Sequence, residues 1–340
     1  MRYPVGPIFQ ALREMSLTAI PADVKAGINS PWSLQDWRES GNYSVVGHNS
    51  RSFILECAPV DLGSCFLTEA ELLLDHIAEQ RVTVWSALFS SGWVSPAWLV
   101  VTIYYWNFFA VLAISRLVGS SVHFLTGGEL KKFKTLASSD CKLGGGAYHF
   151  SFDESISVTK ARYFLTGMKN SNFHEAIWRH FASTMHSAFQ THGDDQANQL
   201  EYRLFRCVAD NPTGKEAVWP TLLRNMVNYR PGVAYREVRN ARLLDVAKYV
   251  RKTPLSDYNE LVSAYENEKQ MAQNFDFDNS CHDYSKLLLL KAAAVTAIAE
   301  RLHLEIRKRR GIDGRWADKR LRFYDQHKVR LEVAARYAAL

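Results

Sequence analysis

The longest apolar stretch of the chain runs from Ala97 to Gly119, and its part from Ala97 to Ile114 carries no charge. This part approaches the roughly 20 residues that a membrane-spanning helix needs. Thr102 and Asn107 interrupt it, and its tyrosines and tryptophan lie at the centre, whereas a span places such residues at its two ends. We therefore interpret the stretch as a core helix of a soluble bundle, with Gly119 as its C-terminal stop, and a single membrane span is the alternative.

Apolar residues at helical spacing predict helices along most of the remaining chain. Thr68 is expected to cap one of them, with Glu71 at the third position of a capping box. From Asn172 onward the chain reads as mainly helical, including the segment HEAIWRHFASTMHSAFQ. A long helix is expected over SKLLLLKAAAVTAIAERLHLEIRKRR, ended by Gly311, and a last one from about Trp316 to Ala339.

Alternation of apolar and polar residues predicts a small amount of strand. Ser52–Val60 fits a short strand, and Tyr148–Phe164 fits a hairpin or two short strands. The predicted fold is mostly α. Residues 1–67 form an irregular, aromatic, strand-containing segment, and residues 68–340 form a helical bundle with a small β insertion at about 120–165.

The net charge of +6 is concentrated at the C-terminal end. Residues 301–340 hold twelve Lys and Arg against five Asp and Glu, a net of +7, so the other 300 residues sum to −1. RNA or another polyanion would be drawn to this region, because each neutralised phosphate releases counterions. The alternative is a solvated helix face with internal salt bridges. The basic residues singled out for nucleic-acid binding are Arg307, Lys308, Arg309, Arg310, Lys319, Arg320 and Arg322.

The cysteines and the absence of common motifs exclude several classes of binding and catalytic site. The five cysteines are odd in number, far apart and without a CxxC pair, which argues against a disulfide framework or a structural zinc and favours a cytoplasmic location. Loops of the GxGxxG, GxxxxGK[ST] and GxSxG types do not occur. The acidic loop around Asp276–Asp283 could hold a divalent ion, but its two phenylalanines favour an anchored loop. We expect no metal and no cofactor.

Three segments together resemble the HEPN superfamily, in its YaaC-like branch. They are IYYWNFFAVLAISRLVG, the stretch from VHFLTGGEL to YHFSFDESISVTKARYFLTG, and LLRNMVNYRPG. The resemblance covers about Ala97 to Arg230 and implies a HEPN-like bundle. It further implies metal-independent RNA cleavage by an arginine and a histidine with four to six residues between them, usually at a dimer interface. In that scheme the arginine stabilises the phosphorane and the histidine takes the 2′-hydroxyl proton.

Arg224 and Asn225 match the start of that motif, but Asn228 and Tyr229 occupy the histidine position. Asparagine cannot accept the proton, and a tyrosine hydroxyl is a poor base at neutral pH. This departure favours a non-catalytic member, in which Arg224 contacts phosphate while Asn225 and Asn228 orient it.

A second arginine–histidine pair, Arg179 and His186, is spaced to share one helix face. The alternative for His186 is an ordinary helix histidine.

Three functions follow as hypotheses. The first is an RNA-directed protein, either a metal-independent ribonuclease or a degenerate RNA binder, in a toxin or antiphage-defence setting that the resemblance alone implies. The second is a non-catalytic assembly subunit that binds another protein or a second copy of itself. The third, a single-span membrane protein, is the least favoured.

Overall fold

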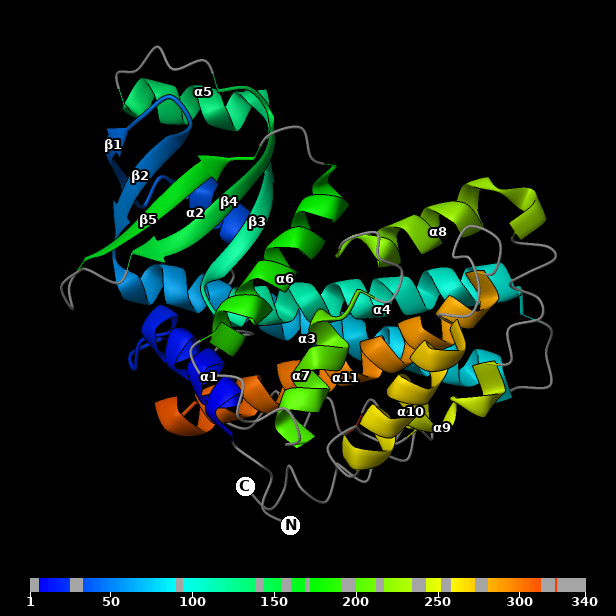
Figure 1. The fold of residues 1–340 in the computed structure, drawn as a ribbon. Coiled ribbons are helices and arrows are strands. Elements are labelled where there is room, and N and C mark those ends of the chain that lie inside the picture. Colours follow the sequence, from blue (N-terminus) through cyan, green and yellow to red (C-terminus); the bar gives the residue numbers. More distant parts are fainter. Residues whose placement is uncertain are drawn as a thin grey trace.

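The computed structural model describes residues 6–24, 33–89, 94–137, 143–153, 160–168, 172–190, 200–211, 217–233, 243–251, 258–272, 281–312 and 322. Helices dominate it, and five strands form one small antiparallel sheet (Figure 1). The helices are α1 (Pro7–Ala19), α2 (Leu34–Ser40), α3 (Pro59–Phe89), α4 (Pro96–Leu117), α5 (Gly127–Leu136), α6 (Phe173–Gln190), α7 (Leu200–Ala209), α8 (Trp219–Tyr229), η5 (Leu243–Asp245), α9 (Lys248–Arg251), α10 (Tyr258–Ala272) and α11 (Cys281–Arg310). The strands are β1 (Ser44–His48), β2 (Ser52–Cys57), β3 (Ser120–Leu125), β4 (Gly146–Asp153) and β5 (Ala161–Gly167).

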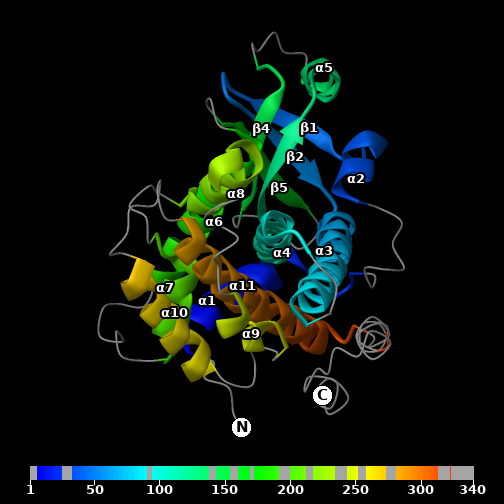
Figure 2. The ribbon, with the colours of Figure 1, turned by 90° about the vertical axis from the view of Figure 1, so that its right-hand side faces the viewer.

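Helix α4 is the centre of the bundle. Figure 2 looks nearly along it and shows α3, α11, α6 and α8 arranged around it. Trp106 in the middle of α4 is fully buried, and its indole Nε1 donates a 2.7 Å hydrogen bond to Thr296 Oγ1 of α11. Within the described residues, α4 alone is long and apolar enough to cross a membrane, and 72% of its most apolar window is buried inside the protein. The aromatic centre of the apolar run is therefore packed against other helices.

Glycine ends α4 and α11 as the sequence predicts. Gly119 follows α4 with a φ of 67°, and a Cβ at this position would lie 2.3 Å from that of Ala19. Gly311 follows α11 with a φ of 63°. Both angles lie in the left-handed region, which glycine enters without the steric cost that a side chain brings.

The predicted helix start at Thr68 is wrong, because α3 begins nine residues earlier, at Pro59. Thr68 lies inside the helix, where its hydroxyl donates a 2.7 Å bond to the Ser64 carbonyl oxygen instead of capping an N-terminus. Glu71 is also buried and pairs with Arg307 of α11. Thr68 and Glu71, whose spacing resembles a capping box, therefore lie within a longer helix, where both side chains are buried.

The predicted strands at Ser52 and after Tyr148 are confirmed. The sheet has the order β1-β2-β5-β4-β3, and β4 and β5 form the predicted hairpin pair, with Phe150 opposite Leu165. Strand β2 pairs with β5, with Leu55 opposite Tyr163. The segments before and after residue 67 thus share one sheet, and α3 runs unbroken across the boundary expected there.

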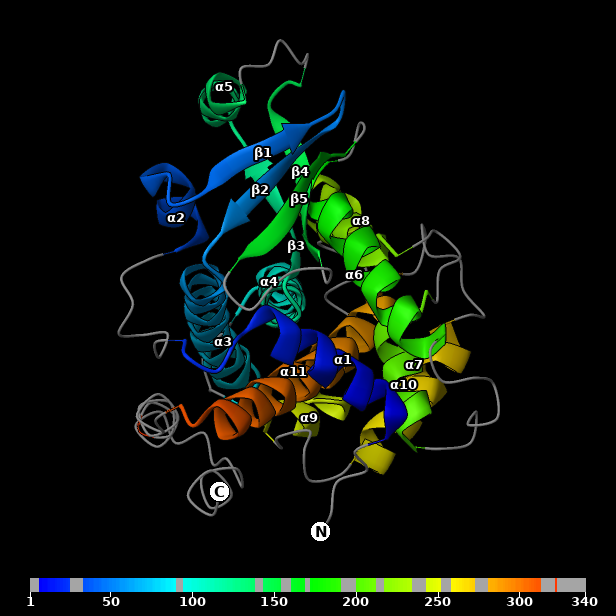
Figure 3. The same cartoon turned by 90° about the vertical axis from the view of Figure 1, so that its left-hand side faces the viewer.

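The sheet has a hydrophobic core of its own at one end of the molecule, above the bundle in Figure 3. Trp37 of α2 and Phe66 of α3 pack on the sheet, and both contact the ring of Phe150. Phe133 of α5 stacks on Phe53 of β2. The sequence predicts an irregular segment before residue 67, but this part of the chain holds helices α1 and α2 and the start of α3. Aromatic contacts such as that of Trp37 with Phe150 join it to the later strands.

Candidate functional site

Arg224 on α8 lies over the aromatic face of α4. Its guanidinium carbon is 6.0 Å from the centre of the Tyr104 ring and 5.9 Å from that of Tyr105. Nη2 donates to the Tyr105 hydroxyl at 3.1 Å, and Nη1 donates to Asn225 Oδ1 at 2.9 Å. Arg224 is thus held by neutral oxygens and by the negative faces of two rings.

Within the described part of the chain, Arg224 lacks a carboxylate partner, a feature that it shares with the half-buried Arg310, which donates to backbone carbonyl oxygens instead. Among the buried or half-buried arginines that do have one are Arg38, Arg81, Arg116, Arg301 and Arg307. Arg224 Nε is also buried without a hydrogen-bond partner. Burial opposes its charged form, but the hydrogen bond with Tyr105 and the nearby tyrosine oxygens outweigh that effect and raise the pKa of Arg224. A cation held without an anion is suited to receive an anionic ligand.

His174 in the first turn of α6 lies beside this arginine. Its Nδ1 is 2.8 Å from the Tyr104 hydroxyl, which is also 3.2 Å from Thr221 Oγ1. The imidazole stacks on Phe108 at 4.6 Å between ring centres. Burial, and then the charge of Arg224, lower the pKa of His174, so the ring is neutral at pH 7. Its Nε2 has no hydrogen-bond partner among the residues described.

The arrangement therefore combines a neutral imidazole with an uncompensated guanidinium. Tyr104 connects them, because its ring lies under Arg224 while its hydroxyl holds His174, and burial raises the pKa of Tyr104 to about 12. A base and a cation that can bind phosphate are two of the groups that RNA cleavage without a metal uses. Sequence reasoning missed His174, since it searched for a histidine a few residues from each arginine.

No protein-family model matches the chain, and no curated protein and no solved structure matches it either.

The remaining motif residues on α8 are placed differently from Arg224. Asn225 contacts the guanidinium directly. Asn228 and Tyr229 lie exposed in the last turn of the helix, and Tyr229 is 72% exposed. The structure thus brings Asn225 into the site with Arg224. Among the described residues, Asn228 and Tyr229 make no hydrogen bond to His174 or Arg224, although the Tyr229 oxygen is near enough to Arg224 to help raise its pKa.

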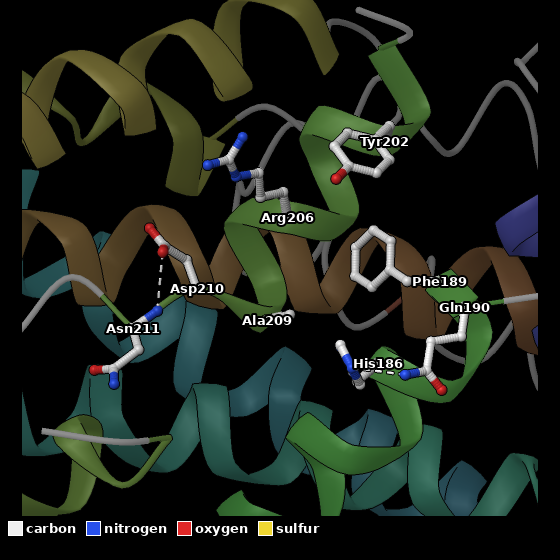
Figure 4. A pocket seen from close by; sticks show the side chains of 8 residues that line it. All are labelled: His186, Phe189, Gln190, Tyr202, Arg206, Ala209, Asp210 and Asn211. Atoms are coloured by element: carbon white, nitrogen blue, oxygen red, sulfur yellow. Dashed lines mark hydrogen bonds between the residues drawn. The ribbon is translucent and has the colours of Figure 1, made fainter. Parts of the chain in front are cut away.

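Arg179 and His186 share helix α6 but make no contact with each other. Arg179 pairs with Glu175 one turn earlier, at 3.7 Å. His186 Nε2 is 3.1 Å from Gln190 Nε2, and both residues line a pocket between α6 and α7 (Figure 4). The predicted pairing of these two side chains is therefore absent, and His186 lines a pocket to which Arg224 does not contribute.

Two of the C-terminal basic residues face the protein interior, which corrects their assignment to nucleic-acid binding. Arg307 is buried and donates to Glu71 of α3. Arg310 donates to the carbonyl oxygens of Leu17 and Ile20 at the end of α1. Both are held because the last turns of α11 pack between α1 and α3.

The other predicted basic residues divide by their placement. Lys308 and Arg309 are exposed, and Arg309 lies 3.8 Å from Glu305. Arg322 is exposed, whereas Lys319 and Arg320 lie outside the described residues. Lys308, Arg309 and Arg322 remain able to attract a polyanion.

A second histidine cluster joins the sheet to the bundle. Ser120 Oγ of β3 lies 3.0 Å from His149 Nε2 of β4, and His180 Nε2 of α6 donates to the Ser120 carbonyl oxygen at 2.9 Å. Burial lowers the pKa of His149 and lowers that of His180 to about 4. Within the described ranges, no three histidine, cysteine or acidic side chains group as metal ligands. We interpret this cluster as a polar link between elements.

Proposed function

We propose that the chain is an RNA-directed protein that cleaves the phosphodiester backbone without a metal ion, at the site formed by Arg224 and His174. The observation that carries the proposal is the pairing of an arginine without a carboxylate partner in the described chain with an imidazole held neutral by burial. Within the described residues, Arg224 has no carboxylate partner, and the Nε2 nitrogen of His174 accepts no hydrogen bond. Together they supply a base and an electrostatic stabiliser at one surface.

The reaction follows from the roles of these two groups. His174 takes the proton of a ribose 2′-hydroxyl, and the resulting oxygen attacks the adjacent phosphorus. Negative charge grows on the phosphate oxygens in the transition state, where the planar guanidinium of Arg224 donates hydrogen bonds. The bond to the 5′-oxygen breaks and this oxygen takes a proton from solvent water, which leaves a 2′,3′-cyclic phosphate and a 5′-hydroxyl; His174 then returns its proton to the solvent. DNA lacks the attacking hydroxyl and is not a substrate.

The HEPN resemblance supports the same reaction class, with one difference. In the resembling motif the histidine follows the arginine on the same segment, and here that position holds Asn228 and Tyr229. His174 supplies the imidazole from another helix, and the Tyr104 hydroxyl fixes its position. The absence of a histidine from the motif on α8 is therefore compatible with catalysis. A toxin or antiphage-defence setting rests on the resemblance alone.

A non-catalytic assembly role is the second candidate, and exposed apolar residues favour it. Trp98 on α4 is 67% exposed, Phe124 on β3 is 55% exposed and Phe89 on α3 is 50% exposed. Side chains of this size at a surface are typical of protein interfaces. The two roles depend on different residues. Assembly through this surface requires Trp98 and is independent of His174.

The test is RNA cleavage in EDTA by the purified protein, with total RNA and tRNA as substrates. Removing Arg224 (Arg224→Ala) should lower the rate about 10²- to 10³-fold, as for other transition-state donors. His174→Ala should lower it by about 10²- to 10⁴-fold, as for a general base. Arg203→Ala is the matched control, because Arg203 pairs with Glu266 away from the site.

The outcomes separate the candidates. Cleavage that persists in His186→Ala and is lost in His174→Ala assigns the base to His174. Cleavage lost in His186→Ala and unchanged in His174→Ala contradicts that assignment. No cleavage by a folded protein, together with an oligomer that Trp98→Ala dissociates, supports the assembly role instead.

A further inference from the structure

A pocket between the end of α6 and α7 lies apart from the Arg224 site. Its volume is about 640 Å³, and its walls come from His186, Phe189 and Gln190 on α6 and from Tyr202 and Arg206 on α7. This volume lies within the range of small-molecule sites. His174 and His186 stand twelve residues apart on one helix, which at the helical rise places the pocket about 18 Å from the Arg224 site.

Aromatic side chains form one side of the pocket. Figure 4 shows Phe189 and Tyr202 on one side of the opening, with Asp210 and Asn211 on the other. The two rings are 5.4 Å apart between centres and nearly perpendicular, at 73°. Phe189 is further braced by Phe205, 6.2 Å away. Rings held in this way offer a fixed apolar surface to a planar ligand.

The charge of the pocket favours an anion. Among the described residues that line the pocket, Asp210 is the only one with a carboxylate, and Lys269 binds both of its oxygens, at 2.9 and 2.8 Å. Arg206 is exposed and has no ion pair with the residues that the structure describes. The neutralised acid and the unpaired guanidinium leave the described lining with a net positive charge, which suits a phosphate.

Neutral polar groups complete the lining. The short contact between Gln190 Nε2 and His186 Nε2 places the amide nitrogen as donor and the imidazole nitrogen as acceptor. The amide oxygen of Gln190 is then left to accept a hydrogen bond from a ligand, and the Tyr202 hydroxyl can donate one. Such groups recognise the polar edge of a heterocyclic base.

From this combination we infer that the pocket binds a nucleoside monophosphate, with the base against Tyr202 and Phe189 and the phosphate on Arg206. The volume accommodates one mononucleotide, and the rings match its flat base. The guanidinium of Arg206, which has no ion pair among the described residues, matches its phosphate. This site does not depend on the ribonuclease activity, because none of its residues belongs to the Arg224 site.

The test is calorimetric titration of the purified protein with AMP, GMP, CMP and UMP, each up to 1 mM. Adenosine and inorganic phosphate serve as probes for the two halves of the ligand. We expect saturable binding of at least one monophosphate, weakened about tenfold or more in Arg206→Gln because a charge-assisted hydrogen bond is lost. Phe189→Leu should weaken the binding of adenosine and the binding of the nucleotide to the same extent.

The control is Arg203→Gln, one turn earlier on α7, whose guanidinium pairs with Glu266. This variant removes the same charge from the same helix and should leave nucleotide affinity unchanged. Each variant is checked by circular dichroism and melting temperature before titration. The inference is overturned if no monophosphate binds by 1 mM. It is equally overturned if Arg206→Gln, correctly folded, binds as tightly as the original chain.

Discussion

Tyr104 and His174 lie 70 residues apart in the chain and meet in a 2.8 Å hydrogen bond between the tyrosine hydroxyl and the imidazole Nδ1. The bond fixes the orientation of the ring and directs the other nitrogen, Nε2, away from Tyr104. The Tyr104 ring packs on His174 at 6.0 Å between centres and on Trp178 at 6.3 Å, so its position does not depend on the hydroxyl alone. Tyr104 is therefore a positioning residue for His174.

Tyr104→Phe should lower the rate of RNA cleavage by about 10- to 100-fold, which is the usual range when a hydrogen bond that orients a functional histidine is lost. The ring stays in place, so the melting temperature should change little. Single-turnover rates across pH give the readout, because a merely structural role would not move the pH profile. A rate and profile equal to those of the original chain would show that the hydroxyl does not hold the base.

The charge of Arg224 should help to keep the pKa of His174 low. Burial is the larger cause of the lowered pKa of His174, and the charge of Arg224 is the second. Cleavage should therefore fall as the pH drops through a value below the ordinary 6.5 and stay level near pH 7, where the ring is neutral. Replacing the charge in Arg224→Gln should raise the pKa of His174 toward 6.5. Histidine ring signals in NMR, assigned with His174→Asn, measure both values.

The sequence predicts those features of the fold that depend on local patterns. The uncharged run before Gly119 has the composition of a core helix. Gly311 marks the end of α11 because the end of a helix depends on the backbone conformation of the residues at that point. The strands β4 and β5 show their period of two directly. Local order of this kind is encoded within one or two helical turns or one strand pair, so no knowledge of the distant chain is needed.

Contacts between residues far apart in the chain could not be predicted from the sequence. Arg307 counts as a surface charge in the sequence, because nothing near it reveals that Glu71, on α3, lies opposite it. His174 and Arg224 escaped notice as a pair for the same reason, since Tyr104 connects them from a third helix. A helix capping signal at Thr68 is equally local, and burial of the whole turn against other elements overrides it.

The hydrogen bond between Trp106 and Thr296 should make a measurable contribution to stability. Both groups are fully buried, so Thr296→Val leaves the indole Nε1 without its partner in an apolar interior. We expect the free energy of unfolding to fall by about 1–3 kcal/mol, the cost of a buried donor left unpaired. Urea titration measures it, and Trp106→Phe with Thr296→Val closes a double-mutant cycle. A coupling energy of zero would show that the bond contributes nothing.

Lys291 on α11 should give the stability of the fold a pH dependence in the alkaline range. Its Nζ donates to the carbonyl oxygen of Val208 at 2.5 Å and to that of Asp210 at 3.3 Å, where α7 ends. The ammonium also lies 5.9 Å from the ring centre of Trp178 and 5.7 Å from that of Trp219. Burial dominates these contacts and lowers the pKa of Lys291 from 10.5 to about 8.

Between pH 8 and 10.5 the unfolded chain therefore holds a proton on Lys291 that the folded chain has released. Unfolding takes up that proton, so the free energy of unfolding gains about 3 kcal/mol from this residue as the pH rises across the window. In Lys291→Met the gain should disappear, even though the variant also loses two hydrogen bonds and is less stable overall. Urea titrations of both proteins from pH 7 to 10.5 measure the difference, and two curves that run parallel across the window would contradict a lysine with a lowered pKa.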